Sequence, residues 1–126
     1  MKIVSLLRCN KLKEAIAFYT NVLDFNLKYP KGSDGEWVVD LINNDGEILL
    51  ASMDGTPRIA IYVIVDDVDA TFKKYVDRGL IVPNNPDSPV HNMPIDQTWG
   101  LREFYVNDPD GNTLRFATPL AGHNQN

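Results

Sequence analysis

The sequence predicts an α+β fold built from two tandem β-α-β-β-β modules, because its two halves repeat one pattern of helix and strands. Sliding the first half by 56 residues superposes three apolar helix positions on three others, placing Leu12, Ile16 and Tyr19 on Val68, Phe72 and Tyr75. A shift of 65 residues superposes the two Asp-Gly turns, Asp45-Gly46 and Asp110-Gly111. One such module leaves a sheet face open to water, so the two are expected to share a buried surface or a cavity.

The first module is expected over residues 2–54. Asn10 can cap a helix that continues to Asp24, because apolar residues recur there at helical spacing. The turn at Asn43–Gly46 predicts a hairpin, since glycine accepts the positive φ that tight turns require. The expected strands are Lys2–Cys9, Phe25–Tyr29, Glu36–Ile42 and Glu47–Met53, with a loop at Pro30–Gly35.

The second module is expected over residues 57–119, followed by a frayed tail at 120–126. Asp66 is the expected cap of its helix, and Gly79 the residue that stops it. A proline-rich loop over Asn84–Gln97 makes this half longer than the first. The expected strands are Arg58–Val65, Leu80–Pro83, Thr98–Asn107 and Thr113–Thr118.

Length and composition indicate one domain over residues 1–126. The chain has 126 residues with a net charge of −5, which argues against a nucleic-acid partner, because such proteins carry a basic face. No apolar run approaches the roughly 20 residues of a membrane helix. Arg8 interrupts the apolar N-terminus and no cleavage site follows, and the single cysteine excludes an internal disulfide. We therefore expect a cytoplasmic protein without a membrane partner.

Three stretches of the chain resemble the vicinal oxygen chelate superfamily, which includes glyoxalase I, extradiol dioxygenases and bleomycin resistance proteins. They are Leu12–Phe25, Val63–Gly79 and Trp99–Phe116, and the likeness extends over residues 2 to 119. The last stretch, with its Trp-Gly-x-Arg-Glu-Phe and Asp-Pro-Asp-Gly-Asn motifs, is similar to the metal-free, bleomycin resistance-like branch. The resemblance implies a curved mixed sheet with a concave ligand cavity.

The same resemblance gives positions at which metal-using members place four ligands. Here these positions are Val4, Leu50, Ala60 and Arg115, and a slip of one residue gives Ser5, Leu49, Ile59 and Leu114. Metals need deprotonated nitrogen, oxygen or sulfur donors, and arginine stays a cation. We therefore expect no metal and no cofactor.

Alternation along the strands then selects a ligand site on the concave face. Leu6, Arg8, Ile48 and Leu50 are expected on that face, and the residues between them under the helices. Trp37 and Trp99 are candidates for stacking on a planar ligand, or else packing residues. Glu103 either neutralises an arginine of the cavity or forms an ordinary salt bridge. The predicted ligand-binding residues are Arg8, Trp37, Ser52, Tyr62, Trp99, Glu103 and Arg115.

Two hypotheses of function follow. The first is a metal-free protein, working as a homodimer, that binds a small organic ligand and sequesters an antibiotic or an aromatic metabolite. The alternative is an enzyme of the same superfamily, a lyase, isomerase or dioxygenase with an atypical active site. The four positions without metal ligands favour the binding protein.

Overall fold

A computed structural model describes residues 1–30, 37–52 and 58–121 of the chain. The chain forms two compact units, the first drawn from Met1–Ile59 with Asn107–Asn112 and the second from Ala60–Val106 with Thr113–Asn126. Neither helix among the described residues has the length and apolar composition that crossing a membrane requires. The loop expected at Pro30–Gly35 and the boundary between the modules at residues 54–57 lie largely or wholly outside the described residues.

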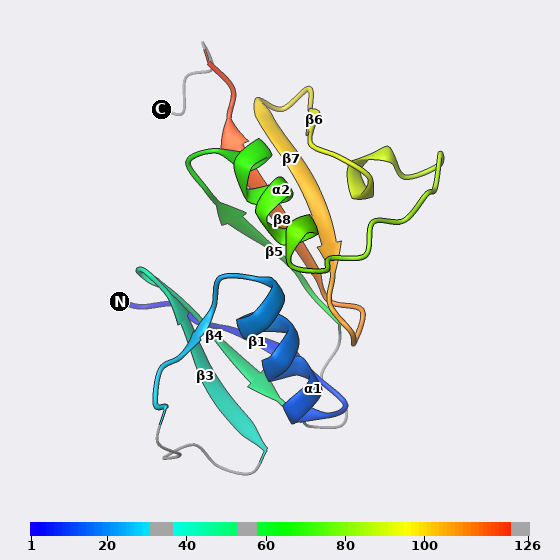
Figure 1. Ribbon diagram of the computed structural model, residues 1–126. Coiled ribbons are helices and arrows are strands. Elements are labelled where there is room, and N and C mark those ends of the chain that lie inside the picture. Colours follow the sequence, from blue (N-terminus) through cyan, green and yellow to red (C-terminus); the bar gives the residue numbers. More distant parts are fainter. Residues whose placement is uncertain (31–36, 53–57, 122–126) are drawn as a thin grey trace. The chain divides into compact units, whose positions relative to one another are not determined.

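Unit 1 is a four-stranded mixed sheet with one helix (Figure 1). The strands lie in the order β1-β4-β3-β2, with β1 parallel to β4 and the other neighbours antiparallel. Helix α1 continues directly into a turn of π-helix, Phe18–Val22. The elements are β1 (Ser5–Arg8), α1 (Leu12–Ala17), β2 (Asn26–Leu27), β3 (Val38–Asn43) and β4 (Gly46–Ala51).

Unit 2 repeats this topology. Its strands lie in the order β5-β8-β7-β6, with β5 parallel to β8, as β1 is to β4 in the first unit. Its elements are β5 (Ala60–Ile64), α2 (Val68–Asp77), a 3-10 turn (Pro89–His91), β6 (Ile95–Asp96), β7 (Leu101–Asn107) and β8 (Thr113–Pro119). The predicted α+β fold of two β-α-β-β-β modules is thereby confirmed.

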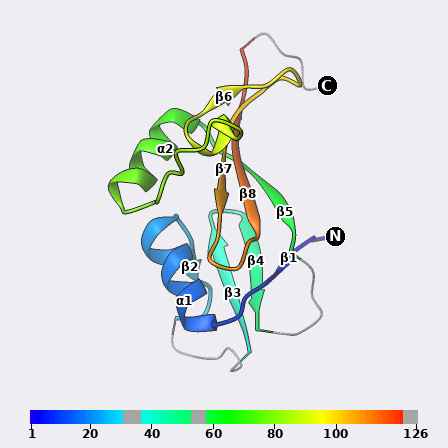
Figure 2. The same cartoon turned by 90° about the vertical axis from the view of Figure 1, so that its right-hand side faces the viewer.

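One face of each sheet packs against the helix of its own unit (Figure 2). In unit 1 this face consists of aliphatic side chains at most 4% exposed: Leu7, Val39, Leu41, Ile48 and Leu50. In unit 2 it is aromatic, with Tyr75 on α2 against Phe104 and Phe116, and those two rings stacked at 5.2 Å between centroids. Burial of such surface is the main source of stability for each unit.

A second buried cluster in unit 1 is polar and centres on Asp108, which is 5% exposed. Its Oδ2 accepts hydrogen bonds from the Tyr19 hydroxyl at 2.8 Å and the Asn112 side-chain amide at 2.9 Å. Its Oδ1 accepts the backbone N–H groups of Asp110 and Asn112, both at 2.9 Å. Burial and the neighbouring Asp108 carboxylate raise the pKa of Tyr19, so its hydroxyl keeps the proton that it donates.

The pairing of β4 corrects the expected assignment of its faces. In the β1–β4 pair, Leu6 lies beside Leu49 and Leu7 beside Leu50. Residues that lie beside each other on neighbouring strands point to the same face of the sheet. Leu50 and Ile48 therefore lie under α1 with Leu7, not on the face of Leu6 and Arg8. The prediction was wrong because Ile48-Leu49-Leu50 is apolar throughout, so no polar residue marks which side faces water.

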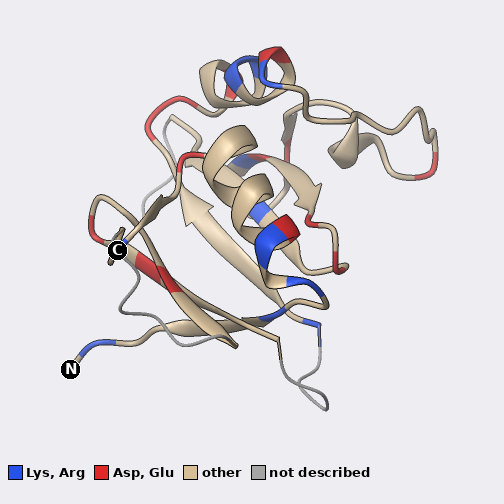
Figure 3. Ribbon diagram, turned by 60° about the horizontal axis from the view of Figure 1, so that its bottom comes forward, with Lys and Arg blue, Asp and Glu red and all other residues tan. Residues whose placement is uncertain are grey.

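The helix caps also differ from expectation. Lys11, not Asn10, precedes α1 and makes no side-chain cap, while Asn10 donates its backbone N–H to Asp110 Oδ1 at 2.7 Å. Asp67, not Asp66, caps α2 by accepting the Ala70 N–H at 3.0 Å. The predicted stop at Gly79 is confirmed by its φ of 103°. Helix α2 carries both lysines and aspartates (Figure 3), and Lys73 and Asp77 pair at 2.9 Å.

Two loops depart from the predicted pattern. Residues 80–83 form no strand; β6 instead occupies Ile95–Asp96, inside the segment expected to be irregular. In the β3–β4 hairpin the residue with positive φ is Asn44 at 53°, not Gly46. Asparagine tolerates this region because its short polar side chain bonds locally, so the turn needs no glycine there.

Candidate functional site

Unit 2 gathers four polar or aromatic side chains on the sheet face opposite α2. Tyr62 on β5 pairs with Arg115 on β8, so both point to one side. On β7, Glu103 and Tyr105 alternate with Phe104, which lies in the aromatic core under α2. Alternation therefore places Glu103 and Tyr105 on the face of Tyr62 and Arg115. We call Tyr62, Glu103, Tyr105 and Arg115 the polar cluster.

Glu103 is the buried centre of the polar cluster, with 0% of the residue exposed. Its Oε1 accepts hydrogen bonds from the Tyr105 hydroxyl at 2.8 Å and from the Tyr62 hydroxyl at 3.4 Å. Its Oε2 is buried and has no hydrogen-bond partner among the described residues. Most buried polar atoms in proteins form hydrogen bonds, so an unsatisfied buried carboxylate oxygen is unusual and makes Glu103 a candidate functional residue.

Arg115 lies against the two phenol rings. Its guanidinium carbon is 4.5 Å from the centroid of the Tyr105 ring and 5.4 Å from that of Tyr62. Nη1 donates to the Tyr62 hydroxyl at 3.1 Å, and this bond raises the pKa of Arg115. Nε is buried without a partner in the described part of the chain. The tyrosine hydroxyl thus bridges the cation and the Glu103 carboxylate.

Tyr105 completes the polar cluster, although sequence reasoning did not select it. Burial, followed by its hydrogen bond to Glu103, raises the pKa of Tyr105 to about 12. The His91 and Tyr105 rings lie edge to face with 5.6 Å between centroids, and the Ser88 hydroxyl pairs with Nδ1 of His91. The sequence signal that could have identified Tyr105 is strand alternation: Glu103 and Tyr105 are two residues apart on β7 and therefore lie on the same face, where Tyr105 joins Tyr62 beside the carboxylate.

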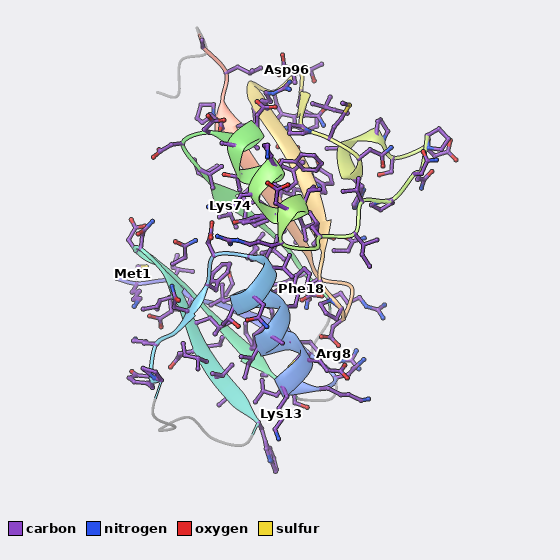
Figure 4. The ribbon with its side chains drawn as sticks, in the orientation of Figure 1. Met1, Arg8, Lys13, Phe18, Lys74 and Asp96 are labelled. Carbon is purple, nitrogen blue, oxygen red and sulfur yellow. The ribbon has the colours of Figure 1, made fainter. Side chains whose placement is uncertain are left out.

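The predicted residues Arg8 and Ser52 lie in unit 1, and both contact Asn10. Arg8 ends β1 beside the start of α1 (Figure 4), and its Nη2 donates to Asn10 Oδ1 at 3.4 Å. The Ser52 hydroxyl donates to the Asn10 carbonyl at 3.3 Å. These contacts tie the end of β4 to the segment before α1.

The two tryptophans are exposed, Trp37 in unit 1 by 67% and Trp99 in unit 2 by 54%. Trp37 contributes its carbonyl, which accepts the Ser52 N–H at 2.7 Å. Neither indole takes part in a ring pair with another described aromatic residue. Of the seven predicted residues, Tyr62, Glu103 and Arg115 are therefore the three that the structure brings into direct contact.

The residues do not fit a metal ion. Across residues 1–30, 37–52 and 58–121, no three side chains of His, Cys, Asp or Glu are grouped so as to hold one. Pairing makes Leu49, not Leu50, the counterpart of Arg115 in unit 1, and neither leucine offers a donor. Glu103 has two phenols as its hydrogen-bond partners, and these donate to it instead of joining it as ligands. His123 lies outside the described residues.

Solved structures with this fold include binding proteins and enzymes. A bleomycin resistance determinant encoded on the transposon Tn5 is 17% identical, with a TM-score of 0.76 over 94% of this chain and 98% of that one. A bleomycin-binding protein from Streptomyces verticillus, complexed with copper(II)-bleomycin, is 19% identical, with a TM-score of 0.68 over 98% and 97%. A lactoylglutathione lyase from Agrobacterium tumefaciens is 15% identical, with a TM-score of 0.70 over 94% and 92%.

The sequence itself matches one family model. No curated protein matches the chain significantly. The model of the Glyoxalase/Bleomycin resistance protein/Dioxygenase superfamily, however, matches residues 3–116, which is most of the chain. This match agrees with the two repeated modules and with the similar solved structures. The chain therefore belongs to the glyoxalase/bleomycin resistance protein/dioxygenase superfamily.

Proposed function

We propose that this protein is a cytoplasmic, metal-independent binding protein that holds a small aromatic molecule, an antibiotic or a metabolite, on the polar cluster of unit 2. The observation that carries the proposal is the contact of Tyr62, Glu103 and Arg115 on one sheet face. Ligand sites combine apolar surface with a few placed polar groups, and on this face the exposed side chain of Ile64 lies beside the polar cluster. Similar folds include proteins whose structures hold bleomycin.

The polar cluster offers a ligand both surface and hydrogen-bonding groups. Tyr62 is 44% exposed, and its neighbour along β5, Ile64, is exposed by 59%. The Arg115 guanidinium has five N–H donors, of which Tyr62 accepts one in the described part of the chain. An aromatic ligand on this face would cover the Tyr62 ring while taking up donors of Arg115.

The low reactivity of the cysteine thiol favours binding over covalent catalysis. Its single cysteine, Cys9, is 2% exposed. Burial, with the neighbouring carboxylates of Asp110 and Asp108, raises the pKa of Cys9 to about 11. At neutral pH this thiol keeps its proton, and the thiolate is the reactive form.

An enzyme remains the second candidate because of one atom. Glu103 Oε2 is a carboxylate oxygen without a described donor, beside the phenol of Tyr105, and such an oxygen could accept a proton in an isomerase or lyase reaction. The two candidates differ in what happens to a bound ligand. Recovery of the unchanged ligand after prolonged incubation supports binding, whereas a product that forms with the wild type and not with Glu103→Gln supports catalysis.

The proposal includes a homodimer. Strands β1 and β5 each lie at the edge of their described four-stranded sheet, and edge strands carry backbone groups open to pairing. Large apolar side chains are exposed in both units, among them Ile3 by 84% and Ile64 by 59%. Symmetric pairing would cover such surface. Sedimentation equilibrium giving twice the chain mass of 14.2 kDa supports the dimer, and the single chain mass contradicts it.

The test of the proposed site uses the two tryptophans as matched reporters. Trp37→Phe leaves Trp99, in the same unit as the polar cluster, as the single indole, and Trp99→Phe leaves Trp37. Bleomycin and a panel of aromatic compounds that raise the melting temperature are titrated into both variants. We expect a fluorescence change in Trp37→Phe and none in Trp99→Phe. The reverse pattern would place the ligand on unit 1 and overturn the assignment.

A further inference from the structure

Arg115 is held in a fixed position while most of its donors stay unused. The Nη1–Tyr62 bond and the two phenol rings, at 4.5 and 5.4 Å, hold the guanidinium from several sides. Its Nε is buried and has no acceptor among the described residues, so a ligand would reach the guanidinium at its Nη atoms. An immobilised guanidinium loses little further conformational entropy when a ligand binds, so little of the favourable binding energy of an anion is lost in ordering the side chain.

We propose that Arg115 anchors a carboxylate on the bound molecule, so that the ligand class is an aromatic carboxylic acid. This inference rests on the proposed function and names the chemistry of the same site. A guanidinium fork matches the two oxygens of a planar carboxylate, and charge-assisted bonds of this kind are the stronger ones. The exposed ring of Tyr62, bonded to the same arginine, offers an apolar surface for the aromatic part.

The competing charge is Glu103, which would favour a cationic ligand instead. Accessibility decides between the two. Glu103 is 0% exposed, its Oε1 is occupied by two phenol hydroxyls, and its Oε2 is buried. Arg115 is only half-buried, so a ligand that approaches the sheet meets the cation first. The buried carboxylate weakens the attraction for an anion without reversing it.

Glu103 acts in this site as a positioning residue. Because it accepts the hydrogens of both phenols, the Tyr62 oxygen turns a lone pair toward Arg115 and accepts from Nη1. Replacing the carboxylate by an amide keeps one acceptor oxygen and removes the charge. The affinity of an anion for Glu103→Gln should therefore rise several-fold, because a nearby like charge is gone. A purely structural role for Glu103 would not change that affinity selectively.

The experiment uses three probes of nearly equal shape: benzoate, benzamide and benzamidine. They are titrated into the full-length protein, and binding is followed by NMR shifts of the tyrosine rings and of the Trp99 indole. The variants are Arg115→Gln and Glu103→Gln. Arg78→Gln is the matched control, because it removes one positive charge, as Arg115→Gln does. Arg78 is exposed and follows α2, on the side of the sheet opposite the polar cluster. Circular dichroism verifies that each variant is folded, and Arg115→Lys replaces Arg115→Gln should the latter unfold.

We expect the wild type to bind benzoate about 10-fold more tightly than benzamide, since one charge-assisted contact has that effect, and benzamidine most weakly. Arg115→Gln should remove the preference, and Arg78→Gln should keep it. Arg115→Lys retains the positive charge but lacks the paired N–H donors of the guanidinium, so the preference for benzoate over benzamide should be reduced but not lost. Preference for benzamidine, or an unchanged ratio in Arg115→Gln, would overturn the carboxylate anchor.

Failure of this inference can be separated from failure of the proposed function. If all three probes shift the tyrosine and Trp99 signals with equal affinity, the site binds aromatic molecules but the anchor is wrong. If no probe shifts them, and no aromatic compound does so in the fluorescence test, the site itself is wrong and both proposals fall.

Discussion

Among the described residues, each unit buries one carboxylate, Asp108 in unit 1 and Glu103 in unit 2, and the two differ in their hydrogen bonding. Asp108 in unit 1 accepts hydrogen bonds at both oxygens, two at Oδ1 and two at Oδ2. Glu103 in unit 2 accepts bonds at Oε1, while Oε2 has no described donor. Both residues are at most 5% exposed, so burial alone does not distinguish them.

The difference indicates two roles for the same chemical group. A buried charge is costly unless it is paired and fully hydrogen-bonded, and Asp108 meets that requirement by joining a tyrosine, an asparagine and a turn. Glu103 does not meet it, although its neighbours are a phenol pair and an arginine. Complete hydrogen bonding is what a structural carboxylate requires, and the Glu103 oxygen that has no described donor is consistent with the proposed ligand site.

The largest expected effect is that of Asp108→Ala. It leaves the Tyr19 hydroxyl, the Asn112 amide and two backbone N–H groups without their acceptor, so we expect a loss of about 3 kcal/mol or more in the free energy of unfolding. Urea denaturation measures the loss. Asp108→Asn, which keeps one acceptor oxygen, should be intermediate. A loss below about 1 kcal/mol for the alanine variant would mean that water replaces these bonds.

Glu103→Gln should affect stability far less. The amide keeps an acceptor for the phenols and removes a buried charge, so the free energy of unfolding should stay within about 1 kcal/mol of the wild type or rise. The same urea series gives the value. If this variant loses as much stability as Asp108→Ala, the two carboxylates share a structural role and the comparison between them fails.

The smallest effect is a difference between two tyrosines at high pH. Tyr105 has a folded pKa of about 12 against an ordinary value of 10.0, so folding holds its proton more tightly. Its contribution to stability is complete below pH 10 and is lost as the pH rises from 10 to about 12. Tyr105→Phe should remove this part of the alkaline loss.

Phenolate absorbance follows the titration directly. In Glu103→Gln the pKa of Tyr105 should fall part of the way from about 12 toward 10, because burial still raises it but the Glu103 carboxylate is absent, whereas the raised pKa of Tyr19 beside Asp108 should stay. Subtracting the Tyr105→Phe titration isolates the residue. An unmoved Tyr105 would show that burial alone raises its pKa.

Sequence patterns predicted the faces of unit 2 better than those of unit 1. Along β7, strand alternation puts Glu103 and Phe104 on opposite faces, and in the structure Phe104 packs against Phe72 on α2 while Glu103 lies in the polar cluster. Along β4, three successive aliphatic residues carry no such mark, and Leu50 was assigned to the wrong face. The shift of 65 residues aligns the two turns but not strands β4 and β8. That shift carries Leu50 onto Arg115, whereas strand pairing makes Leu49 the counterpart of Arg115.

Contacts between distant side chains were not predictable in the same way. Nothing in the local sequence links Tyr19 to Asp108, because the two are 89 residues apart and the pairing arises when the fold closes. The hydrogen bond from Tyr105 to Glu103 depends on side-chain rotamers, which the strand pattern does not give. Arg8 and Ser52 were selected by position along the strand, whereas their hydrogen bonds to Asn10 arise from the turn between β1 and α1.

The turn at Asn107–Asn112 has a consequence for how the chain is made. It belongs to unit 1, although the strands on both sides of it belong to unit 2. The Asn112 side chain donates to the Arg8 carbonyl across 104 residues, at 2.7 Å. During synthesis, unit 1 therefore cannot be completed before residue 112 has been added to the chain. A fragment that ends between the two repeats would lack Asp108, the acceptor of the Tyr19 hydroxyl, so we expect it to be less stable than unit 1 is in the full chain.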